Sequence, residues 1–343
     1  MENNFFKTNL LLLLELWNKE LFFKYEFITK RFLKKRKIMK NLGNHTSEEV
    51  IRELSSTVKK LADIATDDRS LTTLCPEGLP SLQNVKEIIS LLWKLMFPEL
   101  FFDRSLLVSN LEYRIGISTD RLFELLLEEI AIGLSCRGKE ERPDSKVTNP
   151  EAHDLTVQVI RFLPELKRKL YTDIHAIMRK DPAAGNEVEI IISYPSIKAM
   201  LHHRFAHQLF IMNIPYLPRI VSEMAHSRTG IDIHPGASIG DYFAIDHGTG
   251  VVIGETCIIG DYVTIYQGVT LGAKSFSYDE EGVPMNVPRH PLIEDNVTIY
   301  SNTSVLGRIT IGHDSIIGGN VWLTESVPPF SRIVQGVSRN EKQ

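Results

Sequence analysis

The sequence predicts an α+β protein in which an N-terminal all-helical domain is followed by a parallel β-helix of hexapeptide repeats. Two periodicities predict this fold. From about residue 47 to residue 226, apolar residues recur at i, i+3 and i+4, which is the spacing of one buried helix face. From residue 231 onward, aliphatic residues recur at every sixth position. Neither a helix nor an alternating strand has that period, whereas a solenoid of short parallel strands does.

The first 38 residues are expected to be an extension outside the core fold. Glu15 interrupts the leucine run at residues 10–14 well short of the length that spans a membrane. No basic segment precedes these leucines, as one would in a signal peptide. A signal peptide is therefore not expected. The basic run at residues 30–37 is interpreted as a solvated helix face, so no membrane contact is expected either.

The helical domain is predicted over residues 39–226. Ser47 is a suitable N-cap for its first helix, in which the apolar residues Leu54, Val58 and Leu61 share one face. Asn149-Pro150 marks a break between helices, because proline is disfavoured in a helix interior.

The β-helix is predicted over residues 227–330, followed by a short tail at 331–343. Three hexapeptides form one triangular coil, with one aliphatic side chain per strand pointing inward. The repeat slips by two residues after Val251, and it is broken at 272–292 by a polar stretch that we expect to protrude as a loop. The inward positions are Ile233, Ile239, Ile245, Val251, Ile253, Ile259, Ile265, Leu271, Ile293, Ile299, Val305, Ile311, Ile317 and Leu323.

The composition argues against two classes of function. The formal net charge is −4, whereas nucleic-acid-binding surfaces are clustered and basic, so no nucleic-acid partner is expected. Cys75, Cys136 and Cys257 follow no metal-ligand spacing, and we interpret them as buried thiols of a cytoplasmic protein. No resident metal is expected.

Four motifs in combination resemble the serine O-acetyltransferases of the hexapeptide-repeat acyltransferase family. They lie at residues 173–183, 230–237, 245–255 and 289–291. The resemblance implies a left-handed parallel β-helix that assembles into trimers, or into hexamers of two trimers, with active sites between neighbouring subunits. It also implies transfer of an acetyl group from the co-substrate acetyl-CoA to L-serine, which gives O-acetyl-L-serine for cysteine biosynthesis.

The resemblance assigns the acid–base chemistry to His247 and Asp232. The serine hydroxyl ionises far above neutral pH, so a general base must take its proton during attack on the thioester, and histidine suits this task. His247 falls at or near a turn of the coil, and Asp232 lies fifteen residues earlier, just under one coil away. The resemblance implies a dyad in which Asp232 fixes the tautomer of His247.

The resemblance also implies where the substrates bind. Asp181 and Asp246 are expected to pair with the serine ammonium group, and Arg289 and His290 with its carboxylate. Acetyl-CoA is expected in the groove between adjacent β-helices. Its candidate contacts, chosen by position, are Gly272, Ala273, Ser301 and Gly319.

Residues 336–340 bear on whether the chain forms a complex with another enzyme. They read Gly-Val-Ser-Arg-Asn, where many relatives have Gly-Val-Pro-Ala-Arg followed by a tail that ends in isoleucine. That tail docks into O-acetylserine sulfhydrylase, so a stable complex with the sulfhydrylase is not expected here.

Three other functions are open to a protein with this repeat. A hexapeptide acetyltransferase could act on homoserine or a sugar, although Asp181 and the Arg289–His290 pair disfavour this. A non-catalytic trimeric scaffold would need the aliphatic repeats but would have no use for Asp232, Asp246, His247 and His290 together. A γ-class carbonic anhydrase needs three histidines on a zinc ion and leaves the long helical domain unexplained. Its candidate ligands would be His234, His247, His290 and His313.

Overall fold

A computed structural model describes the protein over four stretches, residues 47–67, 78–102, 107–136 and 149–335. The chain divides into two compact units, residues 1–69 and 70–343. The described part of the first unit is helix α2 (Ser47–Asp67). Leu54, Val58 and Leu61 lie on one face of this helix, as their spacing predicts. The predicted extension at 1–38 and the tail motif at 336–340 lie outside the described residues.

The second unit begins with helices that pack around one apolar core. The break predicted at Asn149-Pro150 is the start of α7, where the side chain of Asn149 caps the helix by accepting a hydrogen bond from the amide of Ala152 at 3.1 Å. The last helix continues to Thr229, past the predicted boundary, and ends where Gly230 adopts a left-handed conformation with φ of 68°. The helices are α4 (Leu82–Met96), α5 (Pro98–Phe101), α6 (Leu107–Ser135), α7 (Pro150–Lys180), α8 (Glu187–Ser193), α9 (Pro195–Ile211) and α10 (Leu217–Thr229).

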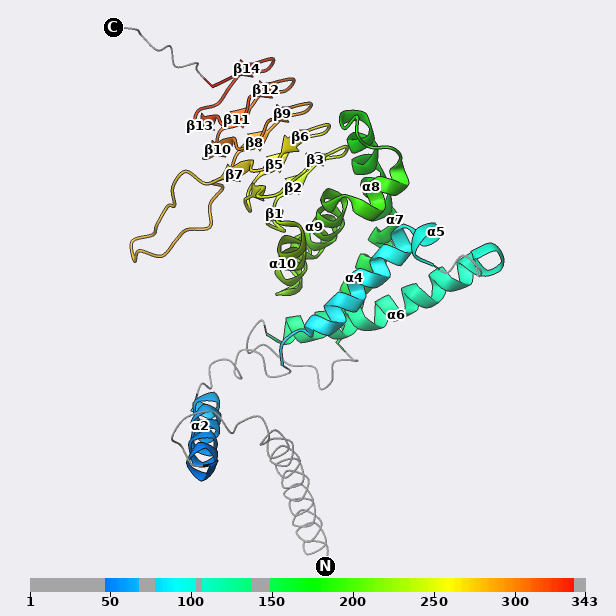
Figure 1. Ribbon diagram of the computed structural model, residues 1–343, viewed down its shortest axis with the longest axis vertical. Helices are drawn as coiled ribbons and strands as arrows, with labels where there is room; N and C mark the ends of the chain where they lie inside the picture. Colours follow the sequence, from blue (N-terminus) through cyan, green and yellow to red (C-terminus); the bar gives the residue numbers. More distant parts are fainter. Residues whose placement is uncertain (1–46, 68–77, 103–106, 137–148, 336–343) are drawn as a thin grey trace, which may run out of the picture. The chain divides into compact units, whose positions relative to one another are not determined.

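The rest of the unit is the predicted parallel β-solenoid, whose strands form three sheets (Figure 1). Sheet A contains β1 (Asp232–Ile233), β4 (Val252–Ile253), β7 (Thr270–Gly272), β10 (Ser304–Leu306) and β13 (Trp322–Leu323). Sheet B contains β2 (Ser238–Ile239), β5 (Ile258–Ile259), β8 (Leu292–Ile293) and β11 (Thr310–Ile311). Sheet C contains β3 (Ala244–Asp246), β6 (Thr264–Tyr266), β9 (Thr298–Ile299), β12 (Ile316–Ile317) and β14 (Arg332–Ile333).

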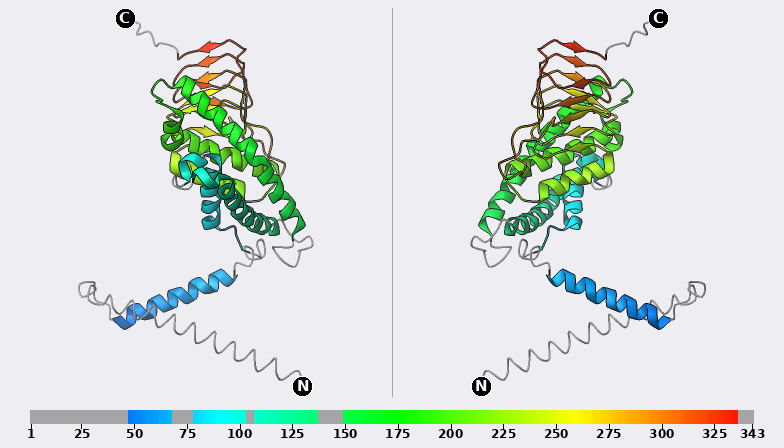
Figure 2. Two further views of the ribbon diagram at one scale, coloured as in Figure 1. Left: turned by 90° about the vertical axis from the view of Figure 1, so that its right-hand side faces the viewer. Right: turned by 90° about the vertical axis from the view of Figure 1, so that its left-hand side faces the viewer.

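The inward side chains stack directly on one another between coils. In sheet A, for example, Ile233 pairs with Ile253, which pairs with Leu271. These residues are at most 4% exposed, so the six-residue period does mark the core of the solenoid. Figure 2 shows the coils as successive layers along the stack, and the loop between β7 and β8 projects from its side (Figures 1 and 2).

The helices meet the solenoid at its first coil through a buried ion pair. Asp173 of α7 accepts two hydrogen bonds, of 2.7 and 2.6 Å, from Arg204 of α9, and the two side chains are 0% and 3% exposed. Arg204 also donates to the carbonyl of Gly240, and Asp173 accepts from the amide of Phe243, both within the first coil. This arrangement fixes the end of α7 against β3.

The cysteines differ in part from the expectation. Cys257 is a buried free thiol, and burial raises its pKa to about 12. Cys136 is disulfide-bonded, which corrects the expectation of three thiols. The sequence offered no spacing from which a pair could be recognised. Over the described stretches, no helix is both long and apolar enough to cross a membrane.

Candidate active site

His247 lies on a turn of the solenoid between sheets C and A, which we call the His247 corner. The connection from β3 to β4 has five residues, 247–251, whereas the equivalent connection from β6 to β7 has three, 267–269. These two extra residues are the slip seen in the repeat. His247 has a left-handed φ of 56°, and its side chain is 73% exposed. The turn therefore presents the imidazole to solvent rather than to the core.

Gly248 makes this turn possible. Its φ is 89°, and a Cβ at this position would approach the side chain of Ile231 to 2.6 Å. A side chain here would be strained in its backbone and would also clash with the core. We infer that glycine is needed after His247 for the imidazole to keep its place.

Asp181 reaches the His247 corner from the end of α7, where it forms the C-cap. Tyr194 donates its hydroxyl to Asp181 Oδ2 at 2.6 Å, and the amide of Ala183 donates to Oδ1 at 2.8 Å. The hydrogen bond from Tyr194, followed by that from Ala183, lowers the pKa of Asp181. The same bond raises the pKa of Tyr194 to about 12. Asp181 is thus held as a carboxylate.

Asp181 and Asp246 line one small cavity together with Ile177, Lys180 and Thr264. Asp246 ends β3, and its Oδ1 lies 3.9 Å from His247 Nε2. The charge of His247 also contributes to lowering the pKa of Asp181, which places Asp181, Asp246 and His247 in one electrostatic neighbourhood. The helical domain and the solenoid therefore supply one carboxylate each to the same corner.

Asp232 lies in β1 and is partly buried. Among the described residues, its carboxylate makes no hydrogen bond to His247. On α10, Glu223 and His226 each offer a ligand atom within 4.8 Å of an oxygen of this carboxylate. The predicted Asp232–His247 dyad thus stays a prediction.

Arg289 and His290 lie at a different turn, between sheets A and B, which we call the Arg289 corner. Arg289 Nη2 donates to Glu255 Oε2 at 2.5 Å, and the two side chains are 21% and 18% exposed. The hydroxyl of Thr256 accepts from the amides of Arg289 and His290, at 2.9 and 3.1 Å. The root of the loop is thereby tied to the coil below it.

His290 is buried with one ring nitrogen satisfied. Its Nδ1 lies 3.1 Å from the donating amide of Thr256, so Nδ1 carries no proton and Nε2 is the donor in the neutral ring. Burial, and after it the charge of Arg289, lowers the pKa of His290 to about 4. A Cβ on Gly254 would lie 2.0 Å from the ring, so the histidine occupies space that only a glycine leaves free.

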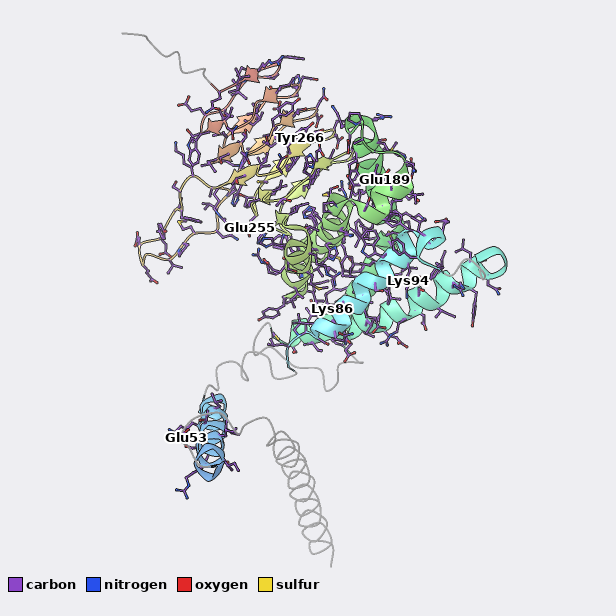
Figure 3. All side chains as sticks on the ribbon, in the orientation of Figure 1. Glu53, Lys86, Lys94, Glu189, Glu255 and Tyr266 are labelled. Atoms are coloured by element: carbon purple, nitrogen blue, oxygen red, sulfur yellow. The ribbon has the colours of Figure 1, made fainter. Side chains whose placement is uncertain are left out.

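The two corners lie on different edges of the solenoid. Figure 3 shows Glu255 near the root of the loop and Tyr266 on the side that faces α8. Tyr266 belongs to the His247 corner, because Asp246 and Asp181 both contribute to raising its pKa, after burial. Within one chain, therefore, Asp181, Asp246 and His247 come together, and Arg289 and His290 form a second group.

The candidate acetyl-CoA contacts divide between the same two edges. Gly272 ends β7 and Ala273 follows it at the edge between sheets A and B, and the carbonyl of Gly272 accepts a hydrogen bond from the amide of Gly307. Ser301 and Gly319 lie at the edge between sheets C and A. A Cβ on Gly319 would lie 3.2 Å from the Ser301 carbonyl oxygen, so these two residues are neighbours on successive coils.

Three residues of the site were not singled out from the sequence. Glu255 lies within a motif used for the resemblance, and its position next to a turn glycine was the available signal. Thr256 follows it directly. Tyr194 gave no sequence signal, because its contact with Asp181 depends on the way α8 folds back on α7.

The four histidines of the alternative zinc site are not brought together within the described residues of one chain. In the described parts of the chain, the group of three or more metal-ligating side chains whose donor atoms converge consists of Glu223, His226 and Asp232. None of the four histidines considered for a carbonic anhydrase belongs to it. His313, for example, pairs with its neighbour Asp314 at 2.7 Å.

Comparisons with known proteins identify the family. Residues 290–325 match the family model for the bacterial transferase hexapeptide (six repeats). The chain is 46% identical over 295 residues to a plasmid-encoded serine acetyltransferase of Synechococcus elongatus, and the match covers 84% of this chain and 92% of the relative. The chain belongs to the serine acetyltransferase family. The enzyme class inferred from the motifs is therefore confirmed.

Two further relatives agree with this assignment. A Bacillus subtilis serine acetyltransferase is 45% identical over 167 residues, which is 49% of this chain and 73% of that protein. The crystal structure of serine acetyltransferase isoform 3 from Entamoeba histolytica in complex with cysteine superposes with a TM-score of 0.64 at 33% identity. It covers 75% of this chain and 84% of that one, and so confirms helices followed by a parallel solenoid.

Proposed function

We propose that this serine acetyltransferase moves the acetyl group of acetyl-CoA to the hydroxyl of L-serine by general-base catalysis at the His247 corner. The observation that supports this most directly is the exposed imidazole of His247 beside two carboxylates, on a turn that is two residues longer than its equivalent in the next coil. Such a group can reach a substrate hydroxyl without disturbing the core.

In the proposed reaction, His247 takes the proton of the serine hydroxyl as its oxygen attacks the thioester carbonyl. A new ester C–O bond forms and the C–S bond breaks. The imidazolium then returns the proton to the departing thiolate of CoA, so that free CoA and O-acetyl-L-serine leave. Asp232 orients the imidazole and stabilises its charged form, as the carboxylate of a catalytic triad does.

The carboxylates of Asp181 and Asp246 would bind the serine ammonium group. Two hydrogen bonds keep Asp181 ionised, and Asp246, which lines the same small cavity, has its Oδ1 3.9 Å from His247 Nε2. An amine held there has its hydroxyl two carbons away, within reach of the imidazole. The site therefore favours an α-amino acid over a sugar.

The serine carboxylate would be bound by Arg289 and by Nε2 of His290. Because Arg289 already pairs with Glu255, that pair fixes the guanidinium and leaves its remaining donors for the substrate. His290, held neutral by burial, offers Nε2–H as a donor to the same carboxylate.

One chain cannot supply this site alone, since the two corners lie on different edges of its solenoid. We propose that the Arg289 corner of one subunit faces the His247 corner of the next subunit in a ring of three. A heterologous contact repeated by rotation closes such a ring. The candidate acetyl-CoA contacts then also meet at that interface, with Gly272 and Ala273 from one subunit and Ser301 and Gly319 from the other.

A thiol-release assay with acetyl-CoA and a panel of acceptors tests this function. We expect CoA release with L-serine, and far slower release with homoserine or sugars. Homoserine is the sharpest comparison, because it keeps the amino and carboxylate groups and adds one methylene, which displaces the hydroxyl from His247. Equal turnover of homoserine, or turnover of sugars alone, would contradict the proposed acceptor site.

A further inference from the structure

A second cluster of chemically capable side chains lies beside Asp232, where α10 meets β1. Glu223 and His226 occupy positions i and i+3 of α10, so both side chains project from one face of its last turns. Asp232, the first residue of β1, brings its carboxylate to that face. One donor atom from each of the three residues lies within 4.8 Å of the other two.

The junction that carries these residues is well fixed. Gly230 turns the chain back after α10 with a left-handed φ of 68°, and its amide donates to the carbonyl of His226 at 2.9 Å. The hydroxyl of Thr229 donates to the carbonyl of Ala225 at 2.8 Å, and that of Ser222 donates to the carbonyl of Ile233 in β1. The three side chains therefore start from backbone that is held in place, as a metal site requires.

The donor spacing suits a transition-metal ion. Glu223 Oε2 lies 3.3 Å from His226 Nδ1. Two ligands of a tetrahedral zinc ion, each at its normal bond length, are separated by about 3.4 Å. The other oxygen of Glu223, Oε1, pairs with Arg219 at 2.6 Å, so the carboxylate is oriented with Oε2 towards the histidine. One oxygen of Asp232 lies within 4.8 Å of both of these donor atoms.

The cluster also differs from the other histidine–carboxylate contacts in the described residues. His153, His175 and His313 each lie beside a single carboxylate. His226 lies beside two carboxylates, one from its own helix and one from the solenoid, and the donor atoms of all three residues lie within 4.8 Å of one another. About half of the Glu223 and His226 side chains is exposed, 45% and 43%, so an ion and one or more waters can reach them.

We propose that Glu223, His226 and Asp232 bind a divalent transition-metal ion such as Zn²⁺, and that the ion inhibits the enzyme by capturing Asp232. One imidazole nitrogen and two carboxylate oxygens leave the fourth position to water. The inhibitory part rests on the proposed function, because only there does Asp232 orient His247. A carboxylate that is bonded to the ion can no longer stabilise the imidazolium during the reaction.

Metal binding is measured first, without any assay of activity. The full chain is stripped with a chelator and titrated with Zn²⁺ by calorimetry, and with Co²⁺ by visible absorption, where nitrogen and oxygen ligands give a d–d band. We expect one site per subunit. Removal of one ligand by His226→Gln or Glu223→Gln should weaken binding by at least about tenfold to a hundredfold, the range found even for outer-shell changes.

His153→Gln is the matched control, because His153 is also a helical histidine beside one carboxylate. It should leave the calorimetric site unchanged. Unaltered Zn²⁺ affinity in both His226→Gln and Glu223→Gln, with each variant folded by circular dichroism, would overturn the site. Loss of the site in His153→Gln would do the same.

Inhibition is measured second, as CoA release against Zn²⁺ concentration. The proposal predicts that activity falls in parallel with occupancy of the calorimetric site. If Zn²⁺ occupies the site and activity does not change, the metal site stands, and the inhibitory role and the orienting role of Asp232 are both wrong. If the enzyme releases no CoA with serine even without metal, the proposed function fails while the binding result remains valid.

Discussion

The His247 corner and the Arg289 corner are both turns of the same solenoid, but they satisfy their polar groups in opposite ways. The imidazole of His247 is 73% exposed and has a carboxylate 3.9 Å away, with no hydrogen bond between them. At the Arg289 corner, Glu255 and Thr256 already pair with Arg289 and His290. The comparison indicates that the first corner leaves its reactive group free for substrate, whereas the second fixes its groups in advance.

Replacing His247, whose imidazole is free for substrate, should have the largest effect on turnover. His247→Ala should lower kcat by about 10² to 10⁴, since this is the contribution of a positioned general base, and acetyl-CoA affinity should change by less than about threefold. Steady-state kinetics and calorimetry measure the two quantities. His313→Ala, at another turn of the solenoid, is the matched control and should retain nearly full turnover. Comparable losses in both variants would mean that the effect is structural.

Removing the carboxylate that the helical domain supplies should have the next largest effect. Asp181→Ala should reduce kcat/KM for serine by at least about thirtyfold, because loss of one partner of a desolvated charge pair costs about 2 to 5 kcal/mol. Acetyl-CoA affinity should stay within about threefold, since the thioester approaches along the solenoid. Normal serine kinetics would show that Asp181 serves only as the C-cap of α7.

Removing the Tyr194 hydroxyl, which donates to Asp181, should have a smaller effect on the kinetics with serine. Tyr194→Phe removes the 2.6 Å hydrogen bond but keeps the ring and the carboxylate. The expected result is a rise in KM for serine of about fivefold with kcat little changed, because a hydrogen bond of this kind contributes about 1 kcal/mol. A fall in kcat at unchanged KM would instead place Tyr194 in the chemical step.

The smallest effect is expected at the Arg289 corner, where the protonation of His290, rather than the rate of the reaction, reports on the pre-formed site. Because the pKa of His290 is lowered to about 4, its neutral form stabilises the fold above the pKa of an unfolded histidine, about 6.5. That stabilisation is lost as the pH falls from about 6.5 towards about 4. Nitrogen-15 NMR of labelled histidine should show His290 as the Nε2–H tautomer at pH 6. A ring that is already charged at pH 6 would contradict the burial argument.

The sequence carried enough information for the fold and for part of the site. The six-residue period marks the inward stack, because each strand contributes one aliphatic side chain and the coils repeat in register. The two-residue slip after Val251 marks the longer turn at His247. The contact between Tyr194 and Asp181 could not be predicted, because it depends on how α8 folds back on α7.

The sequence motifs also could not predict that the His247 corner and the Arg289 corner lie on different edges of the solenoid. A motif identifies residues by their spacing, but it does not show on which edge of the solenoid they lie. That edge is set by the two sheets that the turn connects. The free Cys257 and the bonded Cys136 show the same limit, since pairing depends on distance in the fold. The family assignment did not need these details, because four motifs in combination were sufficient.

Complementation between two inactive variants tests the central claim, that corners of neighbouring subunits form one active site. His247→Ala and Arg289→Ala chains, with different affinity tags, are co-expressed and the mixed oligomers are purified. In every ring of three that contains both chains, one of the three interfaces joins an intact His247 corner to an intact Arg289 corner. The account predicts that the purified mixed rings recover about one third of the wild-type rate, from parents that are each far below it. Mixed oligomers no more active than the two parents would contradict it.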